Sequence, residues 1–226
     1  MEAILIISAC TMGFCLLDQI ITPLKIQGVY YIIHAIHNAM IVGITYPDIV
    51  HAITDLHNVR DYPTNYFAIY LCYSLHLYHI AIYWHKFRKD DWLHHGLMLG
   101  VCLPIGCMVD GHCLTGMALC MTTGFSGGVD YVLLSLVRNG MLHKKIEKRI
   151  NAFMNVWIRS PGCVATATLI TAHVLSIPDI SQIQIFFALL PAILVYWNGQ
   201  YFMEQVVTDY VALAVSSHRS PFDIII

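Results

Sequence analysis

Seven apolar runs of about twenty residues follow one another along the chain, and they constrain its fold more than any other feature. Polar residues, prolines or glycines separate the runs. As a helix, such a run matches the hydrocarbon core of a bilayer, because each residue advances the helix by about 1.5 Å. The runs cover residues 3 to 23, 29 to 50, 64 to 84, 93 to 109, 114 to 137, 150 to 176 and 182 to 205.

The composition agrees with a chain that lies mostly in lipid. Apolar residues make up 58% of the 226 residues and charged residues only 12%, a balance unusual for a soluble domain. We therefore predict an all-α fold, a polytopic membrane bundle of about seven transmembrane helices in a single integral membrane domain, 1 to 226. The formal net charge of −2 and the absence of a long basic run argue against a nucleic-acid partner.

Most of the basic residues lie in two connections, 85 to 92 and 138 to 149. Two predicted spans separate these connections, so they fall on the same side of the membrane. The excess of Lys and Arg on cytosolic or matrix loops predicts that both face that compartment. The first residues then lie on the opposite face, and the tail from 216 to 226 lies on the basic side.

Eight cysteines are scattered through apolar stretches without a CxxC pair, which favours simple packing over a zinc site or a disulfide framework. Cys107 and Cys113 flank a short loop, and they could form a disulfide if that loop faces an oxidising compartment.

Two histidine pairs are repeated inside predicted spans. HAIH contains His34 and His37, and HLYH contains His76 and His79. Residues three apart share one helix face, so each pair suits substrate binding or a metal, and equally a hydrogen-bonded seam between packed helices. Membrane di-iron enzymes use HxxxH and HxxHH patterns, which the chain lacks. We therefore expect no metal and no cofactor, and take the four histidines as candidate substrate-binding residues.

His94 and His95 stand side by side where the fourth run begins. Adjacent side chains on a helix diverge by about 100°, so at most one of them points directly into a cavity. A histidine pair at a membrane mouth suits a reactive site or a site that binds a lipid headgroup, and lying at the interface explains the pair almost as well.

Asp130 and Arg159 complete the set of polar residues expected in one half of the membrane. An ionisable group inside a bilayer is costly unless it faces protein or water, so both are candidate substrate-binding residues. They lie at similar depth on consecutive predicted helices. We therefore also predict a salt bridge between them, which a purely structural role would explain as well.

The order of these features resembles the TLC-domain family, which includes the ceramide synthases. The resemblance spans about residues 30 to 205 and rests on DWLHHG, 91 to 96, and on WIR, 157 to 159. It implies a lipid-binding or lipid-processing membrane protein of the endoplasmic reticulum, with membrane lipids as partners. In the synthases the HH pair at the mouth of a lipid tunnel is held to be catalytic, which assigns that role to His94 and His95 here.

The chain departs from the synthases on the helix that follows. The acids of their HD and later D positions correspond to Thr122 and Phe125, so lipid acyl transfer is one expectation and loss of the chemistry another. The alternative function is a non-catalytic accessory subunit of a larger membrane complex, such as a respiratory assembly of the mitochondrial inner membrane. The apolar end of the chain, 222 to 226, would suit burial against other subunits.

Overall fold

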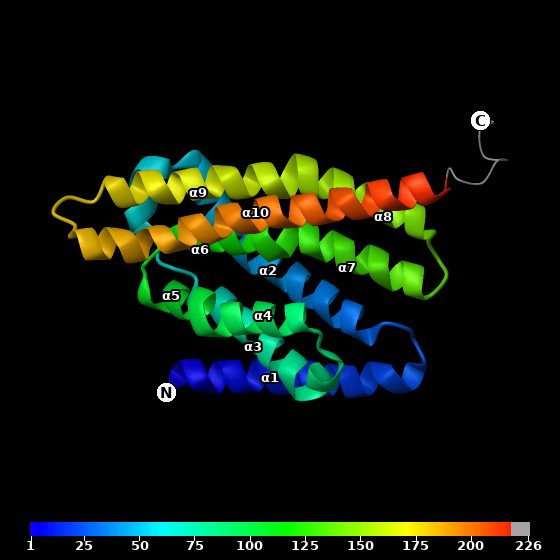
Figure 1. Ribbon diagram of the computed structural model, residues 1–226. Helices are drawn as coiled ribbons and strands as arrows, with labels where there is room; N and C mark the ends of the chain where they lie inside the picture. Colours follow the sequence, from blue (N-terminus) through cyan, green and yellow to red (C-terminus); the bar gives the residue numbers. More distant parts are fainter. Residues whose placement is uncertain (218–226) are drawn as a thin grey trace.

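The computed structural model describes residues 1–217, which form helices and no strand, with 88% of the residues helical. The apolar tail expected to contact a partner lies outside the described residues. The helices join into seven long rods that run alternately in opposite directions (Figure 1).

The first three rods are single helices: α1 (Glu2–Ile21), α2 (Val29–Thr54) and α3 (Tyr66–Tyr83). Short turns of 3-10 helix follow them at η1 (Thr22–Leu24), η2 (Leu56–Asp61) and η3 (Trp84–Lys86). Their starts have local causes. Gly28 adopts a positive φ of 75° directly before α2, and the Asn65 side chain accepts a hydrogen bond from the Ala68 N–H at the start of α3.

The next three rods each contain a π-helical turn. The fourth rod consists of α4 (Lys89–Leu97), η4 (Met98–Cys102) and α5 (Leu103–Met108). The fifth consists of α6 (His112–Leu119), η5 (Cys120–Gly124) and α7 (Phe125–Arg138). The sixth consists of α8 (Lys144–Met154), η6 (Asn155–Arg159) and α9 (Ser160–Leu175). The seventh is α10 (Gln182–Ser217).

Each π turn contains one more residue than the α-helical turn that it replaces. The N–H groups of Leu103, Phe125 and Ser160 bond to carbonyls five residues back, at Met98, Cys120 and Asn155. Such turns are rare and occur mostly as single interruptions of α-helices, often at functional sites. Here they lie in the middle of three consecutive rods.

Two apolar clusters hold the rods together. One joins α1, α2 and α3 through side chains such as Phe14, Ile33 and Leu71. The other joins α6, α9 and α10 to the end of α2 through side chains such as Leu114, Ile170 and Ala192. α1 packs mainly on α3, at the opposite edge of the bundle from α9 and α10 (Figure 1).

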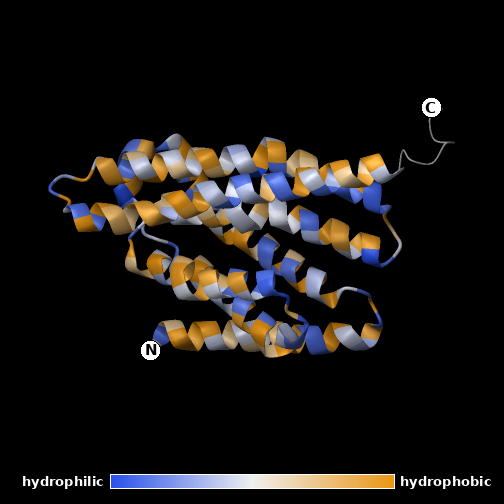
Figure 2. Cartoon of the chain, viewed as in Figure 1, coloured by the Kyte–Doolittle hydropathy of each residue, from blue (hydrophilic) through white to orange (hydrophobic). Residues whose placement is uncertain are grey.

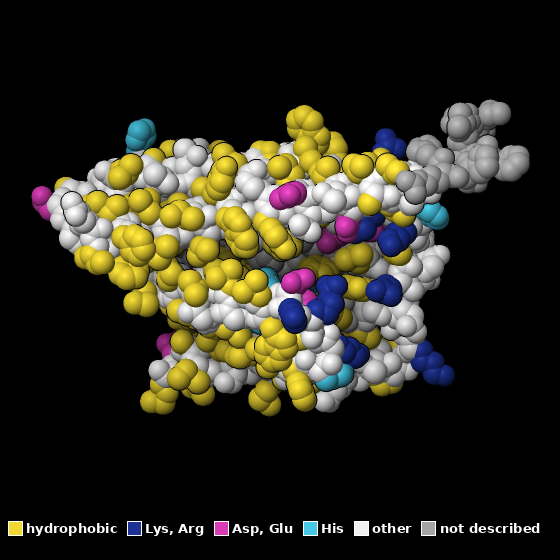
Figure 3. Space-filling view, viewed as in Figure 1, with side chains coloured by type: hydrophobic (Ala, Val, Ile, Leu, Met, Phe, Trp, Pro, Cys, Tyr) yellow, Lys and Arg dark blue, Asp and Glu magenta, His cyan; other side chains and the backbone are white. Residues whose placement is uncertain are grey.

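Three stretches of the described chain are long and apolar enough to cross a membrane: Glu2–Leu24, His112–Arg138 and Gln182–Ser216. Hydrophobic residues run along most rods (Figure 2) and cover much of the visible surface (Figure 3). Each of the other four rods carries a histidine pair or Arg159, and these polar residues lower its mean hydropathy. Seven membrane spans therefore stay a prediction.

The two basic connections lie at the same end of the bundle, as the alternating direction of the rods requires. Lys and Arg side chains gather in that half of the molecule (Figure 3). The start of α1 and the end of α10 lie at opposite ends (Figure 1). All eight cysteines are free, so Cys107 and Cys113 do not pair.

Candidate functional site

An elongated cavity of about 670 Å³ lies among the rods. The fourth rod and α10 form two of its walls, and Figure 3 shows a hollow between them. Lining residues run from Asp90 to Val109 along the fourth rod, a helical length of about 28 Å. The volume falls within the range of roughly 300 to 1,000 Å³ that is usual for small-molecule sites.

The structure brings all eight candidate site residues to this cavity. Six are histidines and two are the ionisable residues of the fifth and sixth rods. They are His34, His37, His76, His79, His94, His95, Asp130 and Arg159. They gather toward one end, while apolar side chains line most of the rest, including Leu103, Leu114, Leu119, Ile170, Val174 and Leu194, and Asp110 and His173 lie at the far end.

The helical spacing of HAIH and HLYH sets the histidine wall on α2 and α3. The His34 ring N–H donates to the Tyr30 carbonyl at 2.7 Å, and the His37 ring lies 2.9 Å from the Asn38 side-chain oxygen. The His34 and His79 rings stack across the two helices, with centroids 4.2 Å apart. His79 is 2% exposed, and neither of its ring nitrogens has a hydrogen-bond partner.

His94 and His95 point in different directions, as the helical angle predicts. His95 is buried; its ring stacks on Phe87, and its Nδ1 lies 2.9 Å from the Nδ1 of His76. His94 is exposed where it lines the cavity, with its ring 5.1 Å from that of His76. The HH pair therefore supplies one ring to the buried cluster and one to the cavity surface.

Three of these histidines also meet a geometric condition for holding a metal. The potential ligand atoms of His76, His79 and His95 all lie within 4.8 Å of one another, and all three residues are buried. No pattern in the sequence predicted this group, because it joins one histidine of the HH pair to both histidines of HLYH.

Asparagines dominate the opposite wall. Asn151 Nδ2 donates to Asp130 at 2.6 Å, and Asn155 Nδ2 donates to the Asn151 side chain at 2.7 Å. Arg159 donates to the Thr122 carbonyl inside the π turn η5 and, at 3.0 Å, to the Asn198 side chain. Its guanidinium also lies 4.1 Å from the centre of the Phe202 ring.

The predicted salt bridge between Asp130 and Arg159 is wrong. No nitrogen of Arg159 lies within 4.0 Å of an Asp130 oxygen, although the two residues line the same cavity. Neutral partners replace the ion pair: Asn151 donates to Asp130, and a backbone carbonyl and Asn198 accept from Arg159. An amide can supply the bond that each charged group needs without bringing a second charge into the interior.

Asn151 and Asn155 are site residues that the sequence analysis missed. Both line the cavity, and the signal was present, because NAFMN places two amides four residues apart on one helix face. Tyr30 and Tyr131 also line the cavity and pack on the His34 ring at 4.1 Å.

The far end of the cavity lies at the turn between α5 and α6. Asp110 lines it, accepting hydrogen bonds from the Thr64 hydroxyl and, at 3.3 Å, from the His112 backbone N–H. Partial burial raises the pKa of Asp110, but these hydrogen bonds outweigh it and hold the pKa below its ordinary value.

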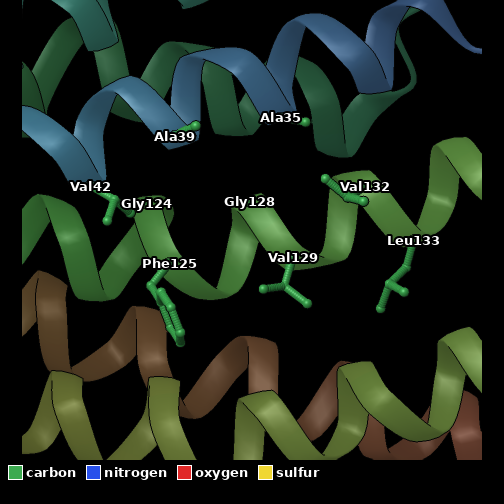
Figure 4. Close-up of a pocket in the computed structure, with 9 residues that line it drawn as sticks. All are labelled: Ala35, Ala39, Val42, Gly124, Phe125, Gly128, Val129, Val132 and Leu133. Atoms are coloured by element: carbon green, nitrogen blue, oxygen red, sulfur yellow. The ribbon is translucent and has the colours of Figure 1, made fainter.

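A second depression lies between α2 and α7 (Figure 4). It is open and shallow, and its lining includes Ala35, Ala39, Gly124 and Gly128 but no titratable side chain. The small residues let the two helices approach closely, since a Cβ on Gly124 would lie 3.1 Å from Ile41. It is therefore a packing groove and not the candidate site.

Comparison of the chain with protein-family models, with curated proteins and with solved structures gave no match.

Proposed function

We propose that this chain is a multi-pass membrane protein that binds a long-chain lipid in the cavity, with the lipid's polar group at the histidine cluster. The observation that carries the proposal is the distribution of polarity along the cavity. The eight candidate residues and the amides of Asn151 and Asn155 gather toward one end, and apolar side chains line most of the rest of a helical length of about 28 Å, with Asp110 and His173 at the far end. A long-chain amphiphile matches this distribution, with its polar group among the histidines and its chain along the apolar stretch.

Two further features support a membrane lipid as the ligand. Large apolar side chains border the hollow between the fourth rod and α10, among them Leu93, which is 71% exposed, and Trp197, which is 49% exposed. In a bilayer this hollow would face acyl chains directly. The TLC resemblance independently implies a lipid ligand of the endoplasmic reticulum.

The experiment is to fill the cavity without touching its polar groups. Ala118 lines the middle of the cavity on α6, and Ala118→Phe would occupy the space of the chain. The matched control is Ala39→Phe, the same substitution in the packing groove. A fluorescent long-chain base in detergent micelles is the probe, and lipids co-purified with the protein are identified by mass spectrometry.

We expect saturable binding by the parent and by Ala39→Phe, and a loss of at least about tenfold in affinity for Ala118→Phe, which corresponds to about 1.4 kcal/mol. Equal binding by all three proteins, or no saturable binding by the parent, would contradict the proposal and favour the accessory-subunit alternative.

A second candidate, lipid acyl transfer, is favoured by one distance. A catalytic imidazole needs a group that orients it, and the Nδ1 of His76 lies 2.9 Å from that of His95. His94, the residue before His95, lies at the cavity surface. The test is N-acylation of a long-chain base by an added acyl thioester, with release of the free thiol, catalysed by the purified parent and compared with His94→Ala and His95→Ala. Equal turnover in all three proteins, or none in the parent, would remove it.

A further inference from the structure

His76, His79 and His95 form a compact group that neither the TLC resemblance nor the proposed lipid binding uses as a unit. We infer that these three side chains bind a divalent transition metal ion of the Zn²⁺ class, with one coordination position open to the cavity. The inference goes beyond the proposed function and does not depend on it.

The distances between the donor atoms fit a zinc site. Zn²⁺ holds histidine nitrogens at about 2.0 to 2.1 Å, so tetrahedral ligands lie roughly 3.3 Å apart. The Nδ1 atoms of His76 and His95 are 2.9 Å apart, and all three donor atoms lie within 4.8 Å of one another. A separation of 4.8 Å would have to shorten by about 1.5 Å to reach the value for tetrahedral zinc ligands.

His79 provides the independent observation that a ligand is needed here. Its side chain is 2% exposed and lines the cavity, yet both of its ring nitrogens lack a hydrogen-bond partner. A buried polar group without a partner costs about 1 to 3 kcal/mol, and such groups are rare in folded proteins. A metal ion bound to one nitrogen removes much of that cost.

The scaffold holds the three rings in place before any ion binds. His76 and His79 share one face of α3, and His95 lies on α4, joined to α3 by the short connection through η3. The His34 ring stacks on His79, and the Phe87 ring stacks on His95 with 4.6 Å between centroids. Ligands fixed by packing on rigid helices lose little freedom when a metal binds.

The donor set indicates the class of metal and its open position. Three neutral imidazoles without a thiolate suit Zn²⁺, Co²⁺, Ni²⁺ or Cu²⁺, and do not suit Mg²⁺ or Ca²⁺, which prefer oxygen ligands. Zinc sites with three protein ligands keep a fourth position for water or substrate. Here the cavity adjoins that position, so a water molecule or an oxygen of the lipid's polar group can occupy it.

The test uses the full-length protein in detergent, purified with an affinity tag that contains no histidine. The chain is stripped with a chelator, loaded with Zn²⁺ or Co²⁺ and desalted, and its metal content is measured by mass spectrometry. We expect about one ion per chain. We also expect the Co²⁺-loaded protein to show the intense absorption of tetrahedral cobalt. This measurement needs neither a variant nor a lipid.

The variants His76→Ala, His79→Ala and His95→Ala should each weaken metal binding by more than about 100-fold, because even the loss of a hydrogen bond to a ligand costs about 10- to 100-fold. The matched control is His37→Ala. It removes a buried histidine that belongs to the other HxxH pair and lies outside the group of three. No stoichiometric ion in the parent, an octahedral Co²⁺ spectrum, or an equal loss in His37→Ala would overturn the inference. If a variant does not fold, the spectrum of the parent decides.

Discussion

Tyr78 and His79 are consecutive residues of α3, but the polar group of Tyr78 is hydrogen-bonded and that of His79 is not. The Tyr78 hydroxyl, fully buried, donates to Asp18 of α1 at 2.5 Å. Asp18 also accepts from the Tyr83 hydroxyl at 2.6 Å and from the Thr22 hydroxyl at 3.2 Å. His79, on the cavity side, has no hydrogen-bond partner at either nitrogen.

The difference separates a polar group that stabilises the fold from one that is available to a ligand. Asp18 is only 7% exposed, and three hydroxyl groups satisfy it, so it fastens α1 to α3. His79 is more deeply buried and contributes no bond to the fold. Burial alone would have ranked the two residues together, whereas their partners distinguish them.

Replacing Asp18 should have the largest effect on stability. In Asp18→Leu the fully buried Tyr78 hydroxyl loses its acceptor, so we expect a loss of about 2 to 4 kcal/mol in the free energy of unfolding. Unfolding in mixed detergent micelles, followed by circular dichroism, measures it. Tyr83→Phe removes one donor and should cost about 1 kcal/mol. Metal binding by both variants should match that of the parent. A loss below about 1 kcal/mol in Asp18→Leu would contradict this assignment.

Replacing His79 should leave the metal-free fold nearly unchanged. His79→Phe keeps a ring for stacking on His34 and removes two unpartnered nitrogens, so we expect a change within about 0.5 kcal/mol, or a gain. The same unfolding experiment in the presence of a chelator tests it. A loss above about 2 kcal/mol would assign His79 to the structural class together with Asp18.

Asp110 should give the smallest effect, and one that depends on pH. Its pKa in the folded protein lies below the unfolded value of about 3.9, so the ionised carboxylate stabilises the fold above that pH. This contribution disappears as the pH falls through the folded pKa. Asp110→Asn should therefore cost less than about 0.5 kcal/mol near neutrality, because the side chain is 61% exposed, and nothing at low pH. A difference that persists in acid would exclude ionisation as its cause.

The positions of the rods could be predicted from the sequence because apolar runs bounded by polar or turn residues are a local signal. The run from 182 to 205 is an instructive exception, since α10 continues to Ser217. Its last turns contain Glu204 and Asp209, which ended the apolar pattern without ending the helix. Hydropathy measures the affinity of a segment for lipid, whereas backbone hydrogen bonds determine where the helix ends.

The composition of the cavity was also predictable, but the pairing of its side chains was not. Buried polar residues in a chain this apolar must face one another or a cavity, and this rule selected eight residues that line the cavity. Which pairs meet depends on the rotation of each rod about its axis. The rule therefore missed the contact of His76 with His95 and predicted an Asp130–Arg159 bond where asparagines take part instead.

The π turn η4 has a genetic consequence. It separates the part of the fourth rod that carries His94 and His95 from the part that carries Leu103 and Gly106, and all four residues line the cavity. The π turn contains one residue more than the α-helical turn it replaces, so deleting one codon within Met98–Cys102 would leave an uninterrupted α-helix whose two parts keep about their present relative orientation. The same deletion in the middle of α3, which has no π turn, would rotate its two parts against each other by about 100°. A one-residue deletion should therefore disturb the cavity less at η4 than in α3.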